Sequence, residues 1–199
     1  MEVKVRLKAS DIARAKKVSN DKQEHFRQKQ QPDTKKIANR PGDEIDFEGA
    51  LAELAVARAT GLQWHAEYYS QQEYKSLRHV LHDVGDLEVR ETTHSDGHLI
   101  LRKRQICPFS PYVLVILEKR LARLVGWCLG KEGRCKKNWK DLGGYGRPNY
   151  MVKQEKLNDM EILFRELRRP IPPYVADEDM MPVLERARGL NVVERAKVE

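Results

Sequence analysis

The sequence predicts an α/β domain in which a mixed β-sheet is flanked by helices. Three observations support this fold class. Residues 46–61 have the spacing and the ends of a buried helix, residues 87–102 contain two strand-like segments around a turn, and residues 112–117 form a continuous apolar run. A helix, then several strands, then further helices is typical of α/β or α+β domains. The length of 199 residues suits one domain with a buried core.

The first 40 residues are expected to form a basic N-terminal arm. Residues 1–7 alternate apolar and charged side chains, which indicates a short strand, and Ser10 suits the cap of a helix that begins at Asp11. Residues 20–40 are polar and broken by a proline, so we expect them to be only conditionally ordered. The arm holds twelve basic and five acidic side chains, and this difference equals the whole formal charge of +7. A pI of 9.3 favours an anionic partner such as nucleic acid.

The helix predicted for residues 46–61 is the clearest element. Asp46 suits its N-cap and Gly61 its C-terminal end. Apolar or small side chains occupy nearly its whole circumference, which predicts burial. Glu53 is set among small apolar residues, so its carboxylate needs a buried partner or a metal ion; the alternative is an ordinary solvated glutamate.

Five strand-like segments follow this helix. They span residues 77–84, 87–93, 98–102, 112–117 and 121–129. Residues 94–97 are typical of a hairpin turn, and the apolar run indicates a strand that is covered on both faces. Gly126 predicts a bulge or a bend. A helix over residues 155–169 and a helical tail over residues 170–199 complete the prediction.

Residues 83–90 carry the candidate chemistry. Residues i and i+2 of a strand lie on one face, so Glu88 and Arg90 point the same way while Val89 points into the core. Asp83 precedes a glycine turn and can come alongside the strand that carries Glu88. Two carboxylates beside a cation suit a hard divalent ion such as Mg²⁺ or Mn²⁺. The alternative is that Asp83 is a turn residue and that Glu88 and Arg90 form a surface pair.

This pattern resembles the PD-(D/E)XK nuclease superfamily, in which an aspartate is followed, after a gap, by Asp or Glu, any residue and Lys. Asp83, Glu88 and Arg90 match it, with arginine in place of lysine and His82 in place of the usual proline. Glu53 lies on the upstream helix, where members commonly carry a glutamate. Together with the strands that follow, the pattern is similar to small, often phage-encoded members of the group.

The resemblance covers residues 45–150 and implies a restriction-endonuclease-like αβββαβ core. In this division residues 1–40 are the basic arm, residues 41–169 the nuclease core and residues 170–199 the helical tail. It further implies a metal-dependent DNA nuclease, probably an endonuclease by type, that acts in phage or mobile-element DNA metabolism.

The same resemblance implies roles for individual residues. Asp83, Glu88 and Glu53 would hold Mg²⁺ or Mn²⁺, the backbone carbonyl of Val89 would add a ligand, and Arg90 would complete the catalytic set. Arginine does not deprotonate in proteins, so Arg90 can bind a phosphate but cannot accept a proton. Either no side-chain base is needed, or another residue such as Lys103 reaches into the site.

Two alternatives to an active nuclease stay open. One is a catalytically weak or inactive module on the same fold that binds DNA or a partner protein. The other is an unrelated basic α/β interaction protein whose helical tail contacts a partner. Beyond DNA, the partners considered are a second copy of the chain in a homodimer and a phage or host protein.

A second basic segment mixes cations with aromatic rings. Such a mixture suits neutralisation of a nucleic-acid backbone and base stacking, and the alternative is a solvated loop. The candidate nucleic-acid-binding residues are Lys131, Arg134, Lys136, Lys137, Trp139, Lys140 and Arg147. The glycine-rich residues 143–146 that follow lack the ending and the setting of a phosphate-binding loop.

Composition excludes several other classes. The longest apolar run is far shorter than the about 18 residues of a membrane-spanning helix, and the polar, basic start does not resemble a secretory signal. Three scattered cysteines are too few for a disulfide framework or a four-cysteine iron–sulfur cluster. We therefore expect a reduced, cytoplasmic setting and no membrane partner. Five of the six histidines lie between positions 65 and 98 without a matching cysteine pair, which gives little support for zinc.

Overall fold

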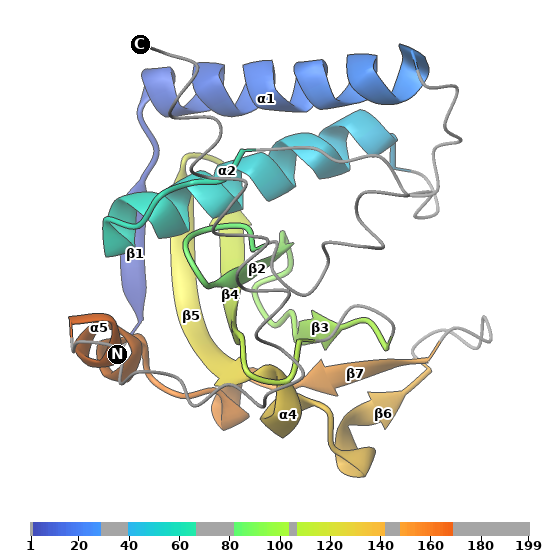
Figure 1. Ribbon diagram of the computed structural model, residues 1–199, viewed down its shortest axis with the longest axis vertical. Coiled ribbons are helices and arrows are strands. Elements are labelled where there is room, and N and C mark those ends of the chain that lie inside the picture. Colours follow the sequence, from blue (N-terminus) through green and yellow to red (C-terminus); the bar gives the residue numbers. More distant parts are fainter. Residues whose placement is uncertain (1, 29–39, 67–81, 104–106, 142–147, 169–199) are drawn as a thin grey trace, which may run out of the picture.

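A four-stranded mixed sheet forms the centre of the molecule, with helices on one face and a small second sheet toward the other (Figure 1). The computed structural model describes residues 2–28, 40–66, 82–103, 107–141 and 148–168. The order of the central strands is β1 (Val3–Arg6), β5 (Leu121–Leu129), β4 (Pro111–Glu118) and β2 (Glu88–Thr92). β2 runs parallel to β4, whereas β4 and β1 are both antiparallel to β5. The predicted mixed α/β class is confirmed at this level.

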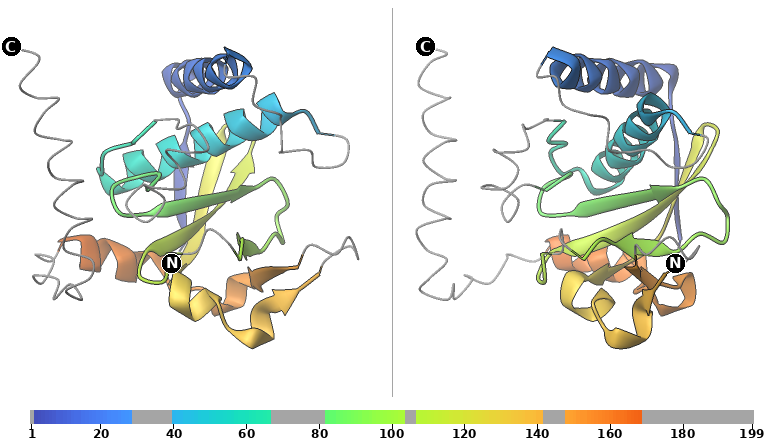
Figure 2. Two further views of the ribbon diagram at one scale, coloured as in Figure 1. Left: turned by 45° about the vertical axis from the view of Figure 1, so that its right-hand side comes forward. Right: turned by 90° about the vertical axis from the view of Figure 1, so that its right-hand side faces the viewer.

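Two long helices cover one face of this sheet in two steps. α2 (Gly42–Thr60) packs on the sheet, and α1 (Ala9–Gln28) packs on the outer side of α2 (Figure 2). Strand β1, which precedes α1, is the edge strand of the central sheet opposite β2. The described part of the N-terminal arm is therefore packed against the rest of the molecule.

Helix α1 begins earlier and ends later than the sequence pattern indicates. It starts at Ala9, so Ser10 lies inside the first turn and is not the cap. Asp11 accepts a hydrogen bond from the backbone N–H of Lys8 (2.7 Å) and thereby binds one of the free amides at the helix start. The helix continues to Gln28 through residues for which we expected only conditional order, because it packs on α2. Residues 29–39 lie outside the described part.

Helix α2 also differs from the prediction at its start. It begins at Gly42, directly after Pro41, and not at Asp46. Asp46 is 5% exposed and pairs with Lys22 of α1 at 3.2 Å, so its carboxylate joins the two helices instead of capping one of them. The predicted C-terminal end is confirmed, because Gly61 has φ +73° and its N–H donates to the carbonyl of Ala57 (2.8 Å).

Strand β4 separates two parts of the core, as its continuous apolar run predicts. Val113 and Val115 belong to the cluster that packs against α2, whereas Tyr112 and Leu114 belong to a second cluster with the small sheet. Its neighbour β5 contains the predicted irregularity. Leu114 pairs with Gly126 but the next residue of β4 pairs with Leu124, so one residue of β5 bulges out.

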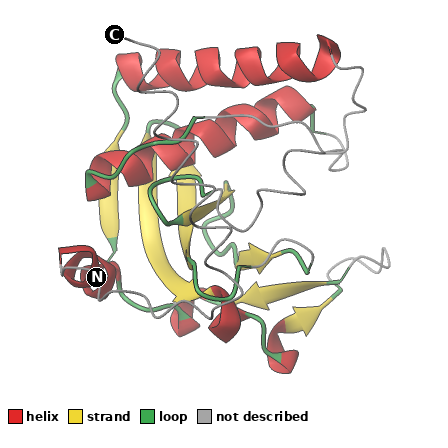
Figure 3. Cartoon of the chain, in the orientation of Figure 1, coloured by secondary structure: helices red, strands yellow, loops and turns green. Residues whose placement is uncertain are grey.

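The second sheet has the order β3 (Leu99–Leu101), β7 (Asn149–Val152) and β6 (Trp139–Lys140), all antiparallel (Figure 3). The hairpin predicted over residues 87–102 is therefore wrong. Its turn forms, with the Gly97 N–H donating to the carbonyl of His94 (2.9 Å), but the two strands enter different sheets. Leu99 and Leu101 are fully buried in the second cluster, and this burial draws β3 away from β2.

Short elements complete the described chain. They are α4 (Gly130–Gly133), η1 (Lys136–Asn138), η2 (Gln154–Lys156) and α5 (Met160–Arg168). α5 confirms a helix within residues 155–169 but starts five residues later than predicted. The tail 170–199 and the glycine-rich residues 143–146 lie outside the described part. Among the described helices, none has the length and apolar character needed to cross a membrane.

Candidate active site

A tight turn over residues 83–87 brings Asp83 back beside the start of β2. The N–H of Leu87 donates to the carbonyl of Val84 (2.8 Å), and the N–H of Asp83 donates to the carbonyl of Leu87 (3.1 Å). Gly85 has φ +54°, and a Cβ there would lie 2.9 Å from Leu62, so the turn requires glycine. The predicted turn is confirmed. The strand predicted for residues 77–84 is absent from its described part, in which residue 84 makes only isolated bridges.

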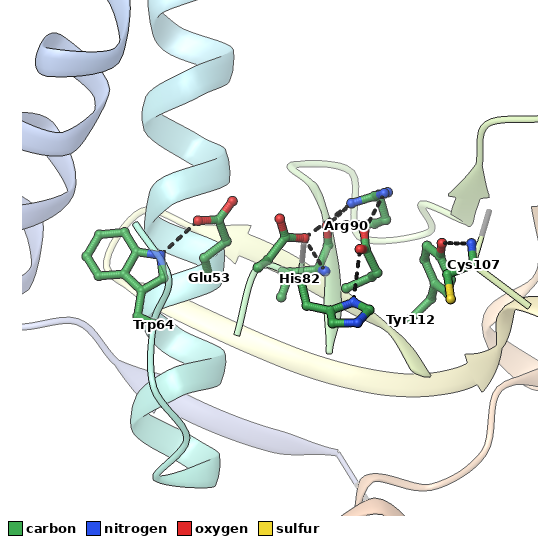
Figure 4. A network of polar contacts seen from close by, with 9 residues as sticks. Glu53, Trp64, His82, Arg90, Cys107 and Tyr112 are labelled. Carbon is green, nitrogen blue, oxygen red and sulfur yellow. Dashed lines mark hydrogen bonds and ion pairs between the residues drawn. The ribbon is translucent and has the colours of Figure 1, made fainter. Parts of the chain in front are cut away.

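The guanidinium of Arg90 binds three oxygen atoms at this point (Figure 4). Its Nη1 donates to the carbonyl of Val89 (2.6 Å) and lies 3.4 Å from Oδ2 of Asp83, and its Nη2 donates to Oε2 of Glu88 (2.9 Å). The backbone N–H of Val89 also donates to Asp83 (2.7 Å). As predicted, Glu88 and Arg90 share one face of β2 while Val89 is 4% exposed on the other.

These three oxygens are the atoms that the family resemblance assigns to a divalent ion. Two carboxylates and a carbonyl match the donor set of Mg²⁺, which commonly takes one or two protein carboxylates and completes its shell with water and phosphate. Their convergence on one cation is the observation that fits a metal here. Within the described residues, however, no three acidic, histidine or cysteine side chains gather closely enough to hold an ion. The positive charge at this point belongs to Arg90.

Glu53 approaches Asp83 from the opposite side. It projects from α2, and its Oε2 accepts a hydrogen bond from the indole N–H of Trp64 (2.8 Å). Figure 4 shows the Asp83 carboxylate between Glu53 and the pair formed by Glu88 and Arg90. Glu53 thus lies in the same region as the other two carboxylates, although it makes no contact with Arg90 among the hydrogen bonds of the described residues.

Burial and like charge perturb these carboxylates. Burial, followed by the negative charge of Asp83, raises the pKa of Glu53 to about 8, against an ordinary 4.5. Burial and the charge of Glu88 raise the pKa of Asp83, while Arg90 opposes this rise. For Arg90, burial lowers the pKa but the two carboxylates raise it more, so the guanidinium stays charged. The region is therefore short of positive charge even with Arg90 in place.

Several neighbours were not predicted as site residues. His82 Nδ1 lies 3.4 Å from Oε1 of Glu88, and the charge of Glu88 raises the pKa of this imidazole despite its burial. The ring of Tyr112 lies under Arg90, with Cζ of the guanidinium 5.4 Å from its centroid. Tyr112 pairs with Glu88 in register across the parallel strands. No local pattern could have found this neighbour, because we did not predict the pairing of β2 with β4.

Helix α1 supplies two further cations near the site. Arg14 lies over the ring of Trp64 at 5.0 Å, and Trp64 in turn binds Glu53. Lys22, paired with Asp46, lowers the pKa of both Glu53 and Asp83 through its charge. The sequence offered no signal for either contact, since both depend on how α1 packs on α2.

The candidate nucleic-acid-binding residues lie around the second sheet. The exposed cations among them are Lys131, Arg134, Lys136, Lys137 and Lys140. Trp139 is half-buried in β6 and contacts the ring of Tyr150 (4.6 Å between centroids). Lys103 does not reach Arg90, since its ammonium lies 5.5 Å from the centroid of the Trp139 ring. Arg147 lies outside the described residues.

Comparisons with known proteins do not extend these observations. The chain matches no protein-family model, no curated protein and no solved structure. Function therefore has to be argued from the residues of the site. What the chain itself shows is a mixed α/β fold with a cluster of carboxylates around one arginine at the edge of its central sheet.

Proposed function

We propose that the chain is a metal-dependent nuclease that hydrolyses phosphodiester bonds in DNA, in phage or mobile-element DNA metabolism. The observation that carries this proposal is the convergence of Asp83, Glu88 and the Val89 carbonyl on a single cation. Glu53 on the preceding helix adds a third carboxylate to the region. The proposal includes a restriction-endonuclease-like core, for which the order of the Glu53 helix, the Asp83 turn and the Glu88 strand is the support.

The chain's own residues have distinct tasks in this proposal. Asp83, Glu88 and the Val89 carbonyl would hold Mg²⁺ or Mn²⁺, with Glu53 orienting water beside it. When bound, the ion polarises the scissile phosphate and lowers the pKa of a bound water. Arg90 leaves the carboxylates and grips the phosphate with two parallel N–H donors, which a planar guanidinium can do and an ammonium cannot. Tyr112 gives its guanidinium a surface to rest on in either position.

The test compares variants that keep side-chain shape but remove charge. Supercoiled, linear and single-stranded DNA are incubated with Mg²⁺ or Mn²⁺, and cleavage is read on gels. Asp83→Asn and Glu88→Gln should each abolish cutting while circular dichroism remains unchanged. Asp86→Asn is the matched control, because Asp86 lies in the same turn with an exposed side chain. Normal cutting by either site variant would refute the role of that carboxylate.

A second candidate is a module that binds DNA without cutting it. It is favoured by the three contacts of Arg90, which already neutralise the oxygens that a metal ion would need. On this reading the arginine is a permanent substitute for the ion. Tight DNA binding with no cleavage of any of the three substrates, in either metal, would support this candidate over the nuclease.

A further inference from the structure

The second sheet and the segment that leads into it are strongly basic. Residues 99–103, 130–141 and 148–153 hold eight lysine and arginine residues but only two acidic ones. One of those acids, Glu132, accepts a hydrogen bond from the backbone N–H of Leu129 (2.9 Å), which directs its carboxylate to the start of α4. The exposed cations include Lys103, Lys131, Arg134, Lys136, Lys137 and Lys140. A polyanion is the complementary partner for such a surface.

Two aromatic positions on this surface each carry a lysine. Phe109 is 59% exposed, although most large apolar side chains are buried, and Lys131 Nζ lies 5.8 Å from its ring centroid. Trp139 and Tyr150 are cross-strand partners whose rings touch, and Lys103 lies over Trp139. We call these five residues the lysine–aromatic surface. A ring that can stack on a base, next to an ammonium that can pair with a phosphate, matches the repeating unit of a polynucleotide.

The lysine–aromatic surface begins next to the candidate active site. The hydroxyl of Tyr112, whose ring lies under Arg90, accepts a hydrogen bond from the backbone N–H of Cys107 (2.9 Å). The same loop is fastened to α4, because the N–H of Lys131 donates to the carbonyl of Pro108 (2.8 Å). Phe109 lies between these two attachments. Figure 1 shows α4, β6 and β7 beyond the end of β4 where this loop lies.

We propose that the lysine–aromatic surface binds single-stranded nucleic acid and leads it toward Arg90. Stacking requires bases whose faces are free, and a duplex offers such faces only at its ends, so the rings select unpaired strands. The proposal rests on the proposed function only for the fate of the strand at the carboxylates. Binding itself is independent of any hydrolysis, and it names the class of substrate.

The experiment measures binding of the full chain without metal, in EDTA, so that failure of cleavage cannot be mistaken for failure of binding. Fluorescence anisotropy is recorded with a labelled oligonucleotide of about 16 nucleotides, the upper site size of common single-strand-binding folds. Single-stranded DNA, single-stranded RNA and the matching duplex are compared over a range of salt. The single strands should bind more tightly than the duplex, and the RNA arm shows whether the sugar matters.

Matched variants separate the surface from general basicity. Phe109→Ala should weaken single-strand binding by about 5- to 100-fold, the loss expected for one stacking ring, and its exposed site makes misfolding a small risk. Lys131→Gln with Lys136→Gln should weaken binding and reduce its dependence on salt. The control replaces two exposed lysines of α1, Lys16→Gln with Lys17→Gln, and should leave binding within about twofold.

A spectroscopic signal tests contact directly. Trp64 and Trp127 are 8% and 4% exposed, so quenching of tryptophan fluorescence by a single strand should come from Trp139 and disappear in Trp139→Phe. Equal affinity for duplex and single strands, or a larger loss in the α1 control than in the surface variants, would overturn the proposal. So would quenching that persists in Trp139→Phe together with unchanged binding by Phe109→Ala.

Discussion

The indole of Trp64 donates its N–H to Glu53 at 2.8 Å, so a carboxylate on the helix is held by a residue from the connection that follows it. The other face of the relationship is electrostatic, since Arg14 of α1 lies over the same indole ring. The orientation of Glu53 toward Asp83 thus depends on two helices and a loop. Changes at Trp64 should act on Glu53 before they act on the fold.

The stability of the metal-free protein should fall as pH rises toward 8. Glu53 has a folded pKa of about 8 against an ordinary 4.5, so the folded state holds its proton more tightly. The associated stability is fully present below pH 4.5 and is lost as pH rises through about 8. The raised pKa of Asp83 adds to this trend. Urea unfolding in EDTA at several pH values should show it.

Two variants check the assignment of this pH dependence to Glu53. Glu53→Gln stays neutral, so its unfolding free energy should vary less with pH than that of the wild type. Trp64→Phe removes a donor that favours the ionised carboxylate, and the decline should therefore move to higher pH. An unchanged pH dependence in Glu53→Gln would show that other groups cause it.

Removal of the Arg90 cation should destabilise the protein and increase its response to metal. Arg90→Met leaves Asp83 and Glu88 without the guanidinium between them, at an expected cost of about 3–5 kcal/mol for a largely buried pair. Mn²⁺ should restore part of this loss, because it can bind the same oxygens. Thermal unfolding with and without Mn²⁺ measures both effects.

Arg123 provides a matched control for Arg90. It also bridges two carboxylates, Glu2 at 2.7 Å and Glu118 at 2.8 Å, but at the far edge of the sheet. Arg123→Met should lower stability only slightly and should not gain a response to Mn²⁺. Equal Mn²⁺ responses in the two variants would contradict a metal site at Arg90.

Two glycines should respond to alanine in opposite directions. At Gly126 a Cβ would lie 2.7 Å from Leu157 and 2.8 Å from the carbonyl of Asn158, so Gly126→Ala should cost about 1–3 kcal/mol. At Gly49, inside α2, a Cβ would meet no atom within 4 Å, so Gly49→Ala should gain about 0.5–1 kcal/mol in helix propensity. Chemical denaturation measures both. A loss at Gly49 would mean that the space beside α2 is filled.

Asp46 should matter far more than its neighbour Asp43. Asp46 is buried and pairs with Lys22, and Gln23 also donates to it, so Asp46→Ala should cost about 3–5 kcal/mol by leaving a partly buried ammonium unpaired. Asp43 is exposed in the first turn of the same helix, and Asp43→Ala should cost about 0.3–1 kcal/mol. Equal losses would show that the contact between α1 and α2 does not depend on this pair.

Local sequence patterns predicted the elements whose signal lies within a few residues. The alternation around Glu88 fixes which side chains face the core, the glycine turn returns Asp83 to the strand, and the unbroken apolar run marks β4 as covered on both faces. Each of these follows from backbone geometry that one short segment determines alone. They were enough to place Asp83, Glu88 and Arg90 together.

The partners of the strands could not be predicted in the same way. Residues 94–97 form a turn whether β3 returns to β2 or joins another sheet, and the choice depends on burial of Leu99 and Leu101 against β7. Asp46 has the composition of a cap, but the distant Lys22 determines its role. Tyr112 and Trp64 likewise come to the site only through pairings between distant segments.

The pairing of β1 with β5 has a consequence for synthesis on the ribosome. Val3 pairs with Leu124, so the first strand has no partner until about 120 further residues have been made, on the order of ten seconds at common translation rates. During this interval the nascent strand exposes Val3 and Val5. The charged Lys4 and Arg6 between and after them oppose edge-to-edge association with other nascent chains. The alternation that defines the strand therefore also protects it while it waits.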